Sequence, residues 1–326
     1  MNKICMLGSG AWGTAVSTVL AENGFDVNLW CHEASVVDSI VKKHCNELFL
    51  PDISLSERIC PFIDMKDCFK DVKWIFEATP VKFLRATLEK AKPHFSESQV
   101  WVVLSKGIEQ DTLLFPSQII DDVFKTKVKK VVLSGPSFAK DVALKQLTAV
   151  AIASEDDKNT SDLKKVLEND YFKTVAYSDV LGLQIGGSLK NVVAIAIGML
   201  DSAGYADNTK VFALTSFLNE MVTLAQHLGA KKETLYGLSG MGDLVLTCMG
   251  NLSRNLKVGK QLGAGKNLDD ILAETNAVPE GVNTVKSVYQ LMKKLQLDLP
   301  LFASIHDVIF GGKTVNDFCK AMMLSC

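Results

Sequence analysis

The sequence lacks an excess of charge of either sign. It contains 35 Lys and Arg residues against 37 Asp and Glu residues, a formal net charge of −2 over 326 residues. Domains that bind nucleic acid usually carry a basic excess, so this balance argues against a nucleic-acid partner. Hydrophobic residues make up 48% of the chain and charged residues 22%, which excludes wholesale disorder. At roughly 150 residues per domain, the length predicts two domains.

Patterns that mark metal sites and disulfide frameworks are also missing. None of the eight cysteines lies in a CxxC pair or has a histidine at zinc-site spacing, and the chain contains no HExxH. Gly312-Lys313-Thr314 resembles the end of a P-loop, but Asp307 stands where the P-loop has its first glycine. We therefore expect free thiols in a reducing compartment, no metal site and no P-loop.

One apolar run, residues 180–200, is long enough to cross a bilayer. However, Lys190 lies at its centre, and a central lysine costs about 2.5–3.5 kcal/mol on insertion. The run therefore predicts a buried core helix and no stable membrane insertion. Near the N-terminus, the first apolar run ends at once in glycines, which is not the plan of a signal peptide. A cytoplasmic location is the resulting expectation.

Short apolar strands alternate with helical patterns in the first part of the chain. The predicted strands are Ile4–Leu7, Val27–Cys31, Trp74–Thr79, Val100–Leu104, Lys130–Leu133, Ala149–Ala153 and Thr174–Ala176, with helices such as Val81–Ala91 and Leu113–Phe124 between them. This alternation predicts an α/β Rossmann domain with a mostly parallel, doubly wound sheet over residues 1–178.

Beyond Tyr177-Ser178 the patterns are helical only. The predicted helices are Val180–Ala203, Thr209–Leu228, Leu268–Glu274, Thr284–Leu295 and Ser304–Ile309. We expect an all-α, substrate-binding and catalytic domain over residues 179–326.

A glycine-rich turn joins the first predicted strand to the first helix. Gly8 permits a tight turn, Gly10 lets the backbone approach a pyrophosphate, and Gly13 lets the helix pack closely on the sheet. The free N–H groups of the helix N-terminus favour phosphate. The turn predicts dinucleotide binding; the alternative is a structural turn without cofactor. His32 and Glu33 end the second strand and favour NADP and NAD respectively, so the choice stays open.

Two lysines need an explanation. Lys106 follows the strand Val100–Leu104, and ligands bind beyond the carboxyl ends of strands in such sheets, although an exposed loop lysine is the alternative. Gly135 to Ala139 follow the end of the next strand. Lys190 lies within an apolar run, so it either extends to the surface or is a buried amine with a tunable pKa. Asn191 beside it offers an amide to a substrate oxygen.

Polar residues also gather later in the chain. Asp243 lies between glycines and an apolar stretch, where it either pairs with a lysine or caps a helix. Ser253, Arg254 and Asn255 offer a hydroxyl, a guanidinium and an amide close together. That set suits a phosphate, although an ordinary surface turn has the same pattern.

Taken together, these segments resemble the NAD(P)-dependent glycerol-3-phosphate dehydrogenases of the bacterial type. The matching stretches, in the family's order, are GSGAWGT from Gly8, SKG from Ser105, GPSFA from Gly135, KNVVA from Lys190, GDLVLT from Gly242, SRN from Ser253 and VPEG from Val278. Trp12 departs mildly from the family's usual Tyr or Phe. Pro279 is a further departure, because it removes a backbone N–H.

The resemblance implies reversible hydride transfer between sn-glycerol 3-phosphate and dihydroxyacetone phosphate with NAD or NADP, feeding phospholipid synthesis, in a homodimer. It implies Lys190 as the acid–base group, with Lys106 and Asp243 in the same catalytic cluster. The implied substrate contacts are Lys106, Gly135, Ser137, Lys190, Asn191, Asp243, Thr247, Ser253, Arg254 and Asn255. The implied cofactor contacts, with the glycines and Glu33, are Ala11, Trp12, His32, Lys106, Ala139, Arg254, Val278 and Glu280.

Two alternatives remain at this point. Another two-domain dehydrogenase, acting on a hydroxy acid or sugar acid, would share the glycine turn but not both KNVVA and the GDLVLT and SRN pair. A non-catalytic NAD-binding regulator would need no buried lysine.

Overall fold

The computed structural model describes residues 2–274 and 279–324, which form two compact units. Met1–Ser105 and Pro116–Val180 make the first unit, and Lys106–Phe115 and Leu181–Cys326 make the second. The longer stretch of the second unit begins at Leu181, and the predicted boundary is residue 179. The segment Lys106–Phe115 differs from that expectation, because its contacts group with the helices and not with the sheet that precedes it.

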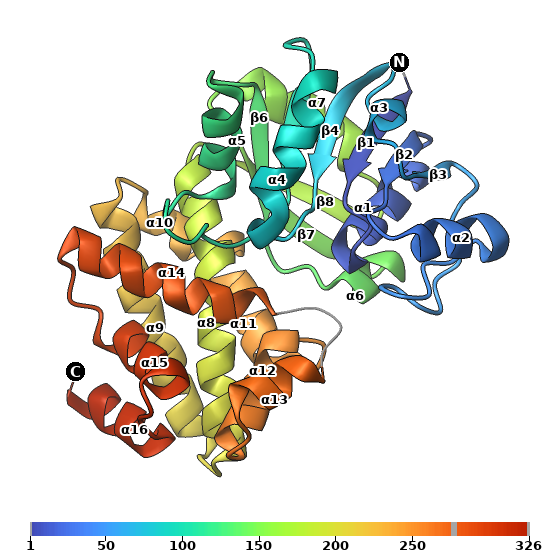
Figure 1. Cartoon of the computed structure of the whole chain (residues 1–326). Coiled ribbons are helices and arrows are strands. Elements are labelled where there is room, and N and C mark those ends of the chain that lie inside the picture. Colours follow the sequence, from blue (N-terminus) through green and yellow to red (C-terminus); the bar gives the residue numbers. More distant parts are fainter. Residues whose placement is uncertain (1, 275–278, 325–326) are drawn as a thin grey trace. The chain divides into compact units, whose positions relative to one another are not determined.

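An eight-stranded sheet forms the centre of the first unit, in the order β3-β2-β1-β4-β5-β6-β7-β8 (Figure 1). All neighbouring strands are parallel except β6 and β7, which confirms the predicted mostly parallel sheet. The strands are β1 (Lys3–Leu7), β2 (Asp26–Trp30), β3 (Ile59–Phe62), β4 (Val72–Glu77), β5 (Val100–Val103), β6 (Lys130–Ser134), β7 (Thr148–Ala153) and β8 (Phe172–Tyr177).

The central strands are near-continuous apolar runs because helices cover both faces of the sheet. The helices of this unit are α1 (Ala11–Glu22), α2 (Ala34–Lys43), α3 (Met65–Cys68), α4 (Val81–Ala91), η1 (Lys92–His94), α5 (Pro116–Phe124), α6 (Ala139–Ala143) and α7 (Asp157–Leu167). The sequence prediction missed β3, which is short, lies at the sheet edge and contains Pro61. The helix predicted from Leu113 begins only at Pro116, because Leu113 has a left-handed φ of 61°.

Within the described residues, every regular element of the second unit is a helix, as predicted. Its helices are α8 (Val180–Ser202), α9 (Asp207–His227), α10 (Lys232–Leu235), the π-helical turn η2 (Leu238–Gly242), α11 (Asp243–Met249), α12 (Arg254–Gly263), α13 (Leu268–Ala273), α14 (Glu280–Leu295), α15 (Pro300–Phe310) and α16 (Val315–Leu324). The sequence analysis did not single out α10, α11, α12 or α16, all of which are short.

Helix α8 passes through the middle of this helical unit (Figure 1). It is long and apolar enough to cross a membrane, but 89% of its most apolar window is buried inside the protein. The interpretation of this run as a core helix is therefore confirmed. The same helix carries Lys190, so the fold places that amine inside the second unit.

Glycines let the neighbouring elements approach α8 closely. A Cβ atom at Gly186 would overlap the carbonyl oxygen of Ser239 in η2, and one at Gly259 of α12 would overlap the carbonyl oxygen of Ile195. Side chains of any size would push these backbones apart. This close packing brings the start of α11 against the middle of α8.

Candidate active site

The glycine turn of the first unit has the geometry that its spacing predicts. Gly8 has φ +112°, and a Cβ there would lie 2.9 Å from the Ala78 carbonyl oxygen. A Cβ at Gly13 would overlap the Gly8 carbonyl oxygen, so α1 packs closely on β1. A Cβ at Gly10 would meet nothing within 4 Å, so the backbone is open to a ligand there.

The N-terminus of α1 is suited to a pyrophosphate. Its N-cap residue is Gly10, which has no side chain to accept from the first-turn N–H groups. The indole Nε1 of Trp12 is buried and has no hydrogen-bond partner in the described protein. Free donors at a positive helix end fit the phosphates of a dinucleotide, so these residues match the cofactor that the sequence predicts. Ala11, Trp12 and Gly13 form that first turn.

The other predicted cofactor positions of the first unit follow strand ends. His32 and Glu33 follow β2, and Glu33 is the N-cap residue of α2. His32 belongs to a hollow of about 330 Å³ lined by Trp30, Cys31, His32, Ile63, Asp64, Met65, Lys90 and His94, so groups of both charge signs line it. Gly135, with φ +142°, follows β6 and accepts from Ser137 Oγ at 3.0 Å, and Ala139 begins α6.

Glu77 is a polar residue of this region that the sequence analysis missed. It is fully buried at the carboxyl end of β4, and its Oε1 accepts from Thr79 N at 2.6 Å and from Ser105 Oγ at 2.8 Å. It therefore holds the residue just before Lys106 to the end of the neighbouring strand. A carboxylate directly after the apolar run Trp74 to Phe76 was the signal that could have found it.

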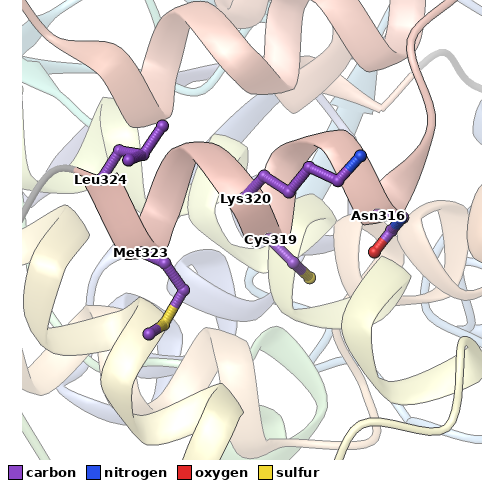
Figure 2. Close-up of a pocket in the computed structure, with 5 residues that line it drawn as sticks. All are labelled: Asn316, Cys319, Lys320, Met323 and Leu324. Atoms are coloured by element: carbon purple, nitrogen blue, oxygen red, sulfur yellow. The ribbon is translucent and has the colours of Figure 1, made fainter.

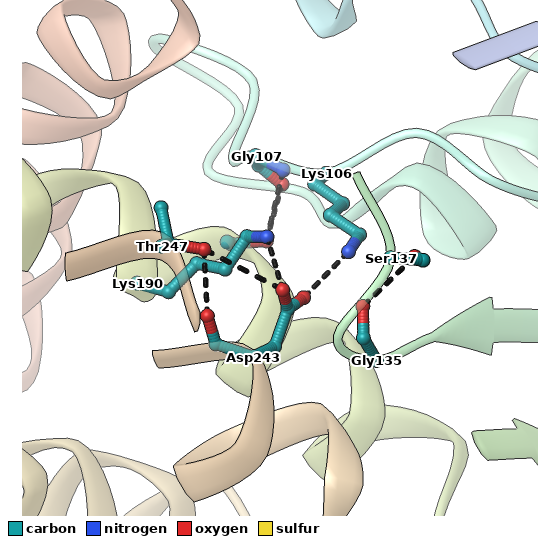
Figure 3. Close-up of polar contacts among 8 residues, drawn as sticks. Lys106, Gly107, Gly135, Ser137, Lys190, Asp243 and Thr247 are labelled. Atoms are coloured by element: carbon teal, nitrogen blue, oxygen red, sulfur yellow. Dashed lines mark hydrogen bonds and ion pairs between the residues drawn. The ribbon is translucent and has the colours of Figure 1, made fainter. Parts of the chain in front are cut away.

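Three charged side chains meet in the second unit (Figure 3). Lys106 Nζ donates to Asp243 Oδ2 at 2.6 Å, and Lys190 Nζ donates to Asp243 Oδ1. The Asp243 side chain is fully buried, and those of Lys106 and Lys190 are only 15% and 11% exposed. Lys190 is therefore a buried, paired amine, and the alternative of a lysine that reaches the surface is wrong. Lys106 is likewise not an exposed loop lysine.

Asp243 does not cap a helix. The N-cap residue of α11 is Gly242, and the Asp243 carboxylate faces the two lysines instead. Thr247, one turn later, donates from Oγ1 to the Asp243 carbonyl oxygen at 2.6 Å. Thr247 Oγ1 also lies 3.5 Å from Asp243 Oδ1, and the helix-cap alternative for this residue is wrong.

The surroundings lower the pKa of Lys190 to about 8. Burial is the largest cause, because it disfavours the charged amine. The negative charge of Asp243 opposes this effect, and the positive charge of Lys106 adds to it. A lysine in this range can both give and take a proton near neutral pH, which is what acid–base catalysis requires.

The Ser-Arg-Asn segment begins α12. Ser253 is the N-cap residue, and its Oγ accepts from Leu256 N at 3.2 Å. Arg254 is exposed, whereas Asn255 is buried and accepts through Oδ1 from Gly281 N at 3.1 Å. A Cβ at Gly281 would also lie 2.8 Å from the Asn191 carbonyl oxygen, so these residues gather beside α8.

The remaining predicted positions are placed only in part. Glu280 begins α14, after Pro279 as its N-cap residue. Val278 lies outside the described residues.

A separate hollow of about 490 Å³ runs along α16 and is lined by Asn316, Cys319, Lys320, Met323 and Leu324 (Figure 2). None of these is a predicted site residue. The seven described cysteines are all free.

Comparison with protein families decides between the possible dehydrogenases. Residues 3–160 match the model of the N-terminal part of NAD-dependent glycerol-3-phosphate dehydrogenase, and residues 179–320 match that of its C-terminal part. The chain belongs to the NAD-dependent glycerol-3-phosphate dehydrogenase family. The resemblance seen in the seven sequence stretches is thereby confirmed.

Individual members of the glycerol-3-phosphate dehydrogenase family resemble the chain over its whole length. It is 39% identical to glycerol-3-phosphate dehydrogenase [NAD(P)+] of Bacillus subtilis and 38% identical to that of Bacillus velezensis, in each case over 99% of this chain and 94% of the relative. The crystal structure of glycerol-3-phosphate dehydrogenase from Coxiella burnetii superposes with a TM-score of 0.94 at 30% identity, covering 99% of this chain and 98% of that one. The chain is thus an NAD(P)-dependent oxidoreductase by family.

Proposed function

We propose that this chain interconverts sn-glycerol 3-phosphate and dihydroxyacetone phosphate with NAD(H) or NADP(H). The observation that carries the proposal is the buried trio of Lys190, Asp243 and Lys106 in a chain of this family. A non-catalytic NAD-binding regulator has no need of a buried amine whose pKa is lowered to about 8.

Lys190 acts as the acid–base group. When a ketone is reduced, its oxygen needs a proton, and the ammonium of Lys190 supplies it; when the alcohol is oxidised, the neutral amine takes the proton back. The bound nicotinamide supplies or accepts the hydride. Burial keeps the amine away from bulk water, so the proton is delivered to the substrate oxygen and not to solvent.

Asp243 and Lys106 set the state of Lys190. Burial lowers the pKa of Lys190 most; the carboxylate of Asp243 keeps it from falling further, and the charge of Lys106 lowers it additionally. Because two cations share one anion, the cluster has a net positive charge. That charge also attracts a substrate that carries a phosphate.

Arg254 holds the substrate phosphate, because a guanidinium presents paired donors to phosphate oxygens. Asn255, Thr247, Ser253 and Asn191 complete the polar set of the helical unit around the substrate. Gly135 and Ser137 are the substrate contacts that we propose in the Rossmann unit.

The first unit binds the cofactor through the turn at the start of α1. Gly8, Gly10 and Gly13 shape that turn, and the N–H groups of Ala11 and Trp12 face the pyrophosphate. His32 and Glu33 receive the adenosine ribose. Further cofactor contacts in this proposal are Lys106, Ala139, Arg254, Val278 and Glu280.

One assay tests the proposal against both alternatives. The oxidation of NADH and of NADPH is followed spectrophotometrically with dihydroxyacetone phosphate, with 2-keto acids and without an acceptor. We expect turnover with dihydroxyacetone phosphate and none with 2-keto acids or without an acceptor. Turnover with a keto acid would favour a hydroxy-acid dehydrogenase, and cofactor binding without turnover would favour a regulator.

The remaining parts of the proposal concern the setting of the enzyme. We place it in the cytoplasm as a homodimer whose product feeds phospholipid synthesis. Light scattering on the purified protein is expected to give twice the mass of one chain. A mass equal to that of a single chain would contradict the dimer while leaving the proposed reaction untouched.

A further inference from the structure

Two buried serines hold the chain segment that carries Lys106. Ser188 of α8 uses one hydroxyl twice: its Oγ accepts from Gly107 N at 2.9 Å and donates to Gly107 O at 3.2 Å. Ser287 of α14 donates from Oγ to the carbonyl oxygen of Ile108 at 2.8 Å. Both serine residues are fully buried.

This segment has no regular secondary structure to fix it. The strand β5 ends at Val103, and residues 104–109 lie in neither helix nor strand. Gly107 has φ +143°, in the region open mainly to glycine. Its N–H and carbonyl groups are therefore not paired by the regular hydrogen bonds of a helix or a strand. Buried backbone donors and acceptors require partners, and the Ser188 hydroxyl is the partner of both Gly107 groups.

The position of Ser188 on α8 gives this contact a consequence for the reaction. Lys190 follows Ser188 by two residues on the same helix, and Lys106 immediately precedes Gly107. The two lysines meet on opposite oxygens of Asp243. The Ser188 hydroxyl thus links the segment that carries Lys106 to the helix that carries Lys190.

We propose that Ser188 is a positioning residue for this enzyme, because its hydroxyl fixes the backbone of Gly107 and thereby holds Lys106 on Asp243 beside Lys190. The inference rests on the proposed reaction. In this role the Ser188 hydroxyl contacts the backbone of Gly107 and acts through Lys106.

The test compares Ser188→Ala in two backgrounds. In the otherwise unchanged enzyme, kcat for reduction of dihydroxyacetone phosphate is expected to fall roughly 10- to 100-fold, since small misplacements of catalytic groups cost this much. In a Lys106→Met background the same change is expected to cost less than about twofold. An equal loss in both backgrounds would overturn the proposal, because Ser188 would then act independently of Lys106.

The matched control is Ser202→Ala, which removes a hydroxyl from the other end of the same helix. Ser202 Oγ donates to Gly198 O at 3.3 Å within α8, away from the Lys106 segment. This control is expected to keep the kcat of the unchanged enzyme. A comparable loss in Ser202→Ala would show a general effect on α8 and would contradict the positioning role.

The pH profile separates positioning from a merely structural role. In Ser188→Ala the pKa seen in kcat/KM is expected to move up from about 8, because Lys106 no longer holds its charge beside Lys190. A lower melting temperature with an unchanged profile would overturn the proposal. If Ser188→Ala does not fold, Ser287→Ala loosens the same segment at Ile108 and is expected to move the profile in the same direction.

Amide hydrogen exchange tests the contact without turnover. In Ser188→Ala the exchange of the Gly107 amide is expected to accelerate at least about tenfold, while that in Ser202→Ala stays unchanged. Unchanged exchange would refute the tether even in an active enzyme. If the enzyme without any substitution does not reduce dihydroxyacetone phosphate, the proposed function is refuted instead. The failure of the tether and the failure of the proposed function are therefore distinguishable.

Discussion

At the scale of single residues, the proposed chemistry depends on a carboxylate shared by two lysines. A buried charge is costly unless it is paired, and Asp243, with no exposed surface, offers one oxygen to each amine. One cation remains in excess of the anion, and burial makes the proton of Lys190 easier to release than that of an exposed lysine. The arrangement prepares one nitrogen for proton transfer near neutral pH.

Removal of that nitrogen should abolish most of the acid–base catalysis. Lys190→Ala is expected to lower kcat for ketone reduction by at least about 10²-fold, measured under saturating cofactor and substrate. The control is Lys257→Ala, an exposed lysine of α12, which should keep its rate. A near-normal kcat in Lys190→Ala would remove this residue from the mechanism.

The pKa of Lys190, lowered to about 8, predicts opposite pH dependences for the two directions. Reduction needs the ammonium, so its kcat/KM is expected to fall as the pH rises above about 8. Oxidation needs the neutral amine, so its kcat/KM is expected to rise over the same range. Asp243→Asn removes the charge that raises this pKa and should move both limbs to lower pH. Profiles that stay in place in Asp243→Asn would contradict this electrostatic coupling.

Arg254 should matter for binding more than for chemistry. Arg254→Ala is expected to raise KM for dihydroxyacetone phosphate roughly 10- to 100-fold, which corresponds to about 1.5–3 kcal/mol for a lost charged hydrogen bond. The same variant should bind phosphate-free ketones no worse than the unchanged enzyme does. Steady-state kinetics with both kinds of substrate measure these KM values. An unchanged KM for the phosphorylated ketone would exclude Arg254 from the phosphate site.

At the scale of elements, the site is built by close packing around α8. Helix α12 and the turn η2 contact α8 through backbone atoms at glycines, and α11 follows directly on η2. Asp243 is the first residue of α11, so its position depends on how closely η2 approaches the helix that carries Lys190. Close packing of backbones thus brings the Asp243 carboxylate within hydrogen-bond reach of the Lys190 amine.

A side chain at the closest of these contacts should loosen the packing. In Gly259→Ala, the new Cβ would overlap the Ile195 carbonyl oxygen, and we expect a loss of about 1–3 kcal/mol in the free energy of unfolding. Denaturant unfolding measures this loss. Lys257→Ala, on the exposed face of α12, is the control and should stay within about 0.5 kcal/mol of the unchanged protein. Equal stability of Gly259→Ala would show that α8 and α12 can separate at little cost.

At the scale of the whole molecule, each unit has its own apolar core, and the proposed catalytic trio lies in the second unit. Lys106, Lys190 and Asp243 all lie in the second unit, because Lys106–Phe115 groups with the helices. The first unit contains the glycine turn and the strand ends. The polar cluster is therefore assembled by the folding of the helical unit together with one segment from the middle of the Rossmann sequence.

The free energy of unfolding should depend on pH through the titration of Glu220. This residue of α9 accepts from Leu301 N at 2.8 Å and Phe302 N at 3.1 Å at the start of α15, and burial raises its pKa to about 7. A raised carboxyl pKa means that the folded state holds the proton more tightly, so its stabilising contribution is present below about pH 4.5 and is lost as the pH rises to about 7.

Glu220→Gln is expected to remove that part of the pH dependence, on the order of 2 to 3 kcal/mol between about pH 4.5 and 7. Denaturant unfolding across this pH range measures it. Glu233→Gln, an exposed residue of α10, is the control and should keep the pH dependence of the unchanged protein. Parallel stability curves for the unchanged protein and Glu220→Gln would contradict the raised pKa.

Local patterns in the sequence determined much of the fold and the candidate residues. Apolar runs predicted seven of the eight described strands, and the exception, β3, is a short edge strand that contains Pro61. Glycine spacing predicted the turn at Gly8 to Gly13, and the motifs predicted the family. These features depend on residues that are near one another in the chain, so their physical causes can be read without coordinates.

Only the tertiary structure decided which of those residues meet. Asp243 is 53 residues from Lys190 and 137 residues from Lys106, and no local pattern predicts that one carboxylate binds both. The roles of Ser188 and Glu77, and the grouping of Lys106–Phe115 with the helices, depend in the same way on distant backbones packed together. Such contacts are set by how whole elements fit around a core, because burial and close packing are properties of the assembled chain.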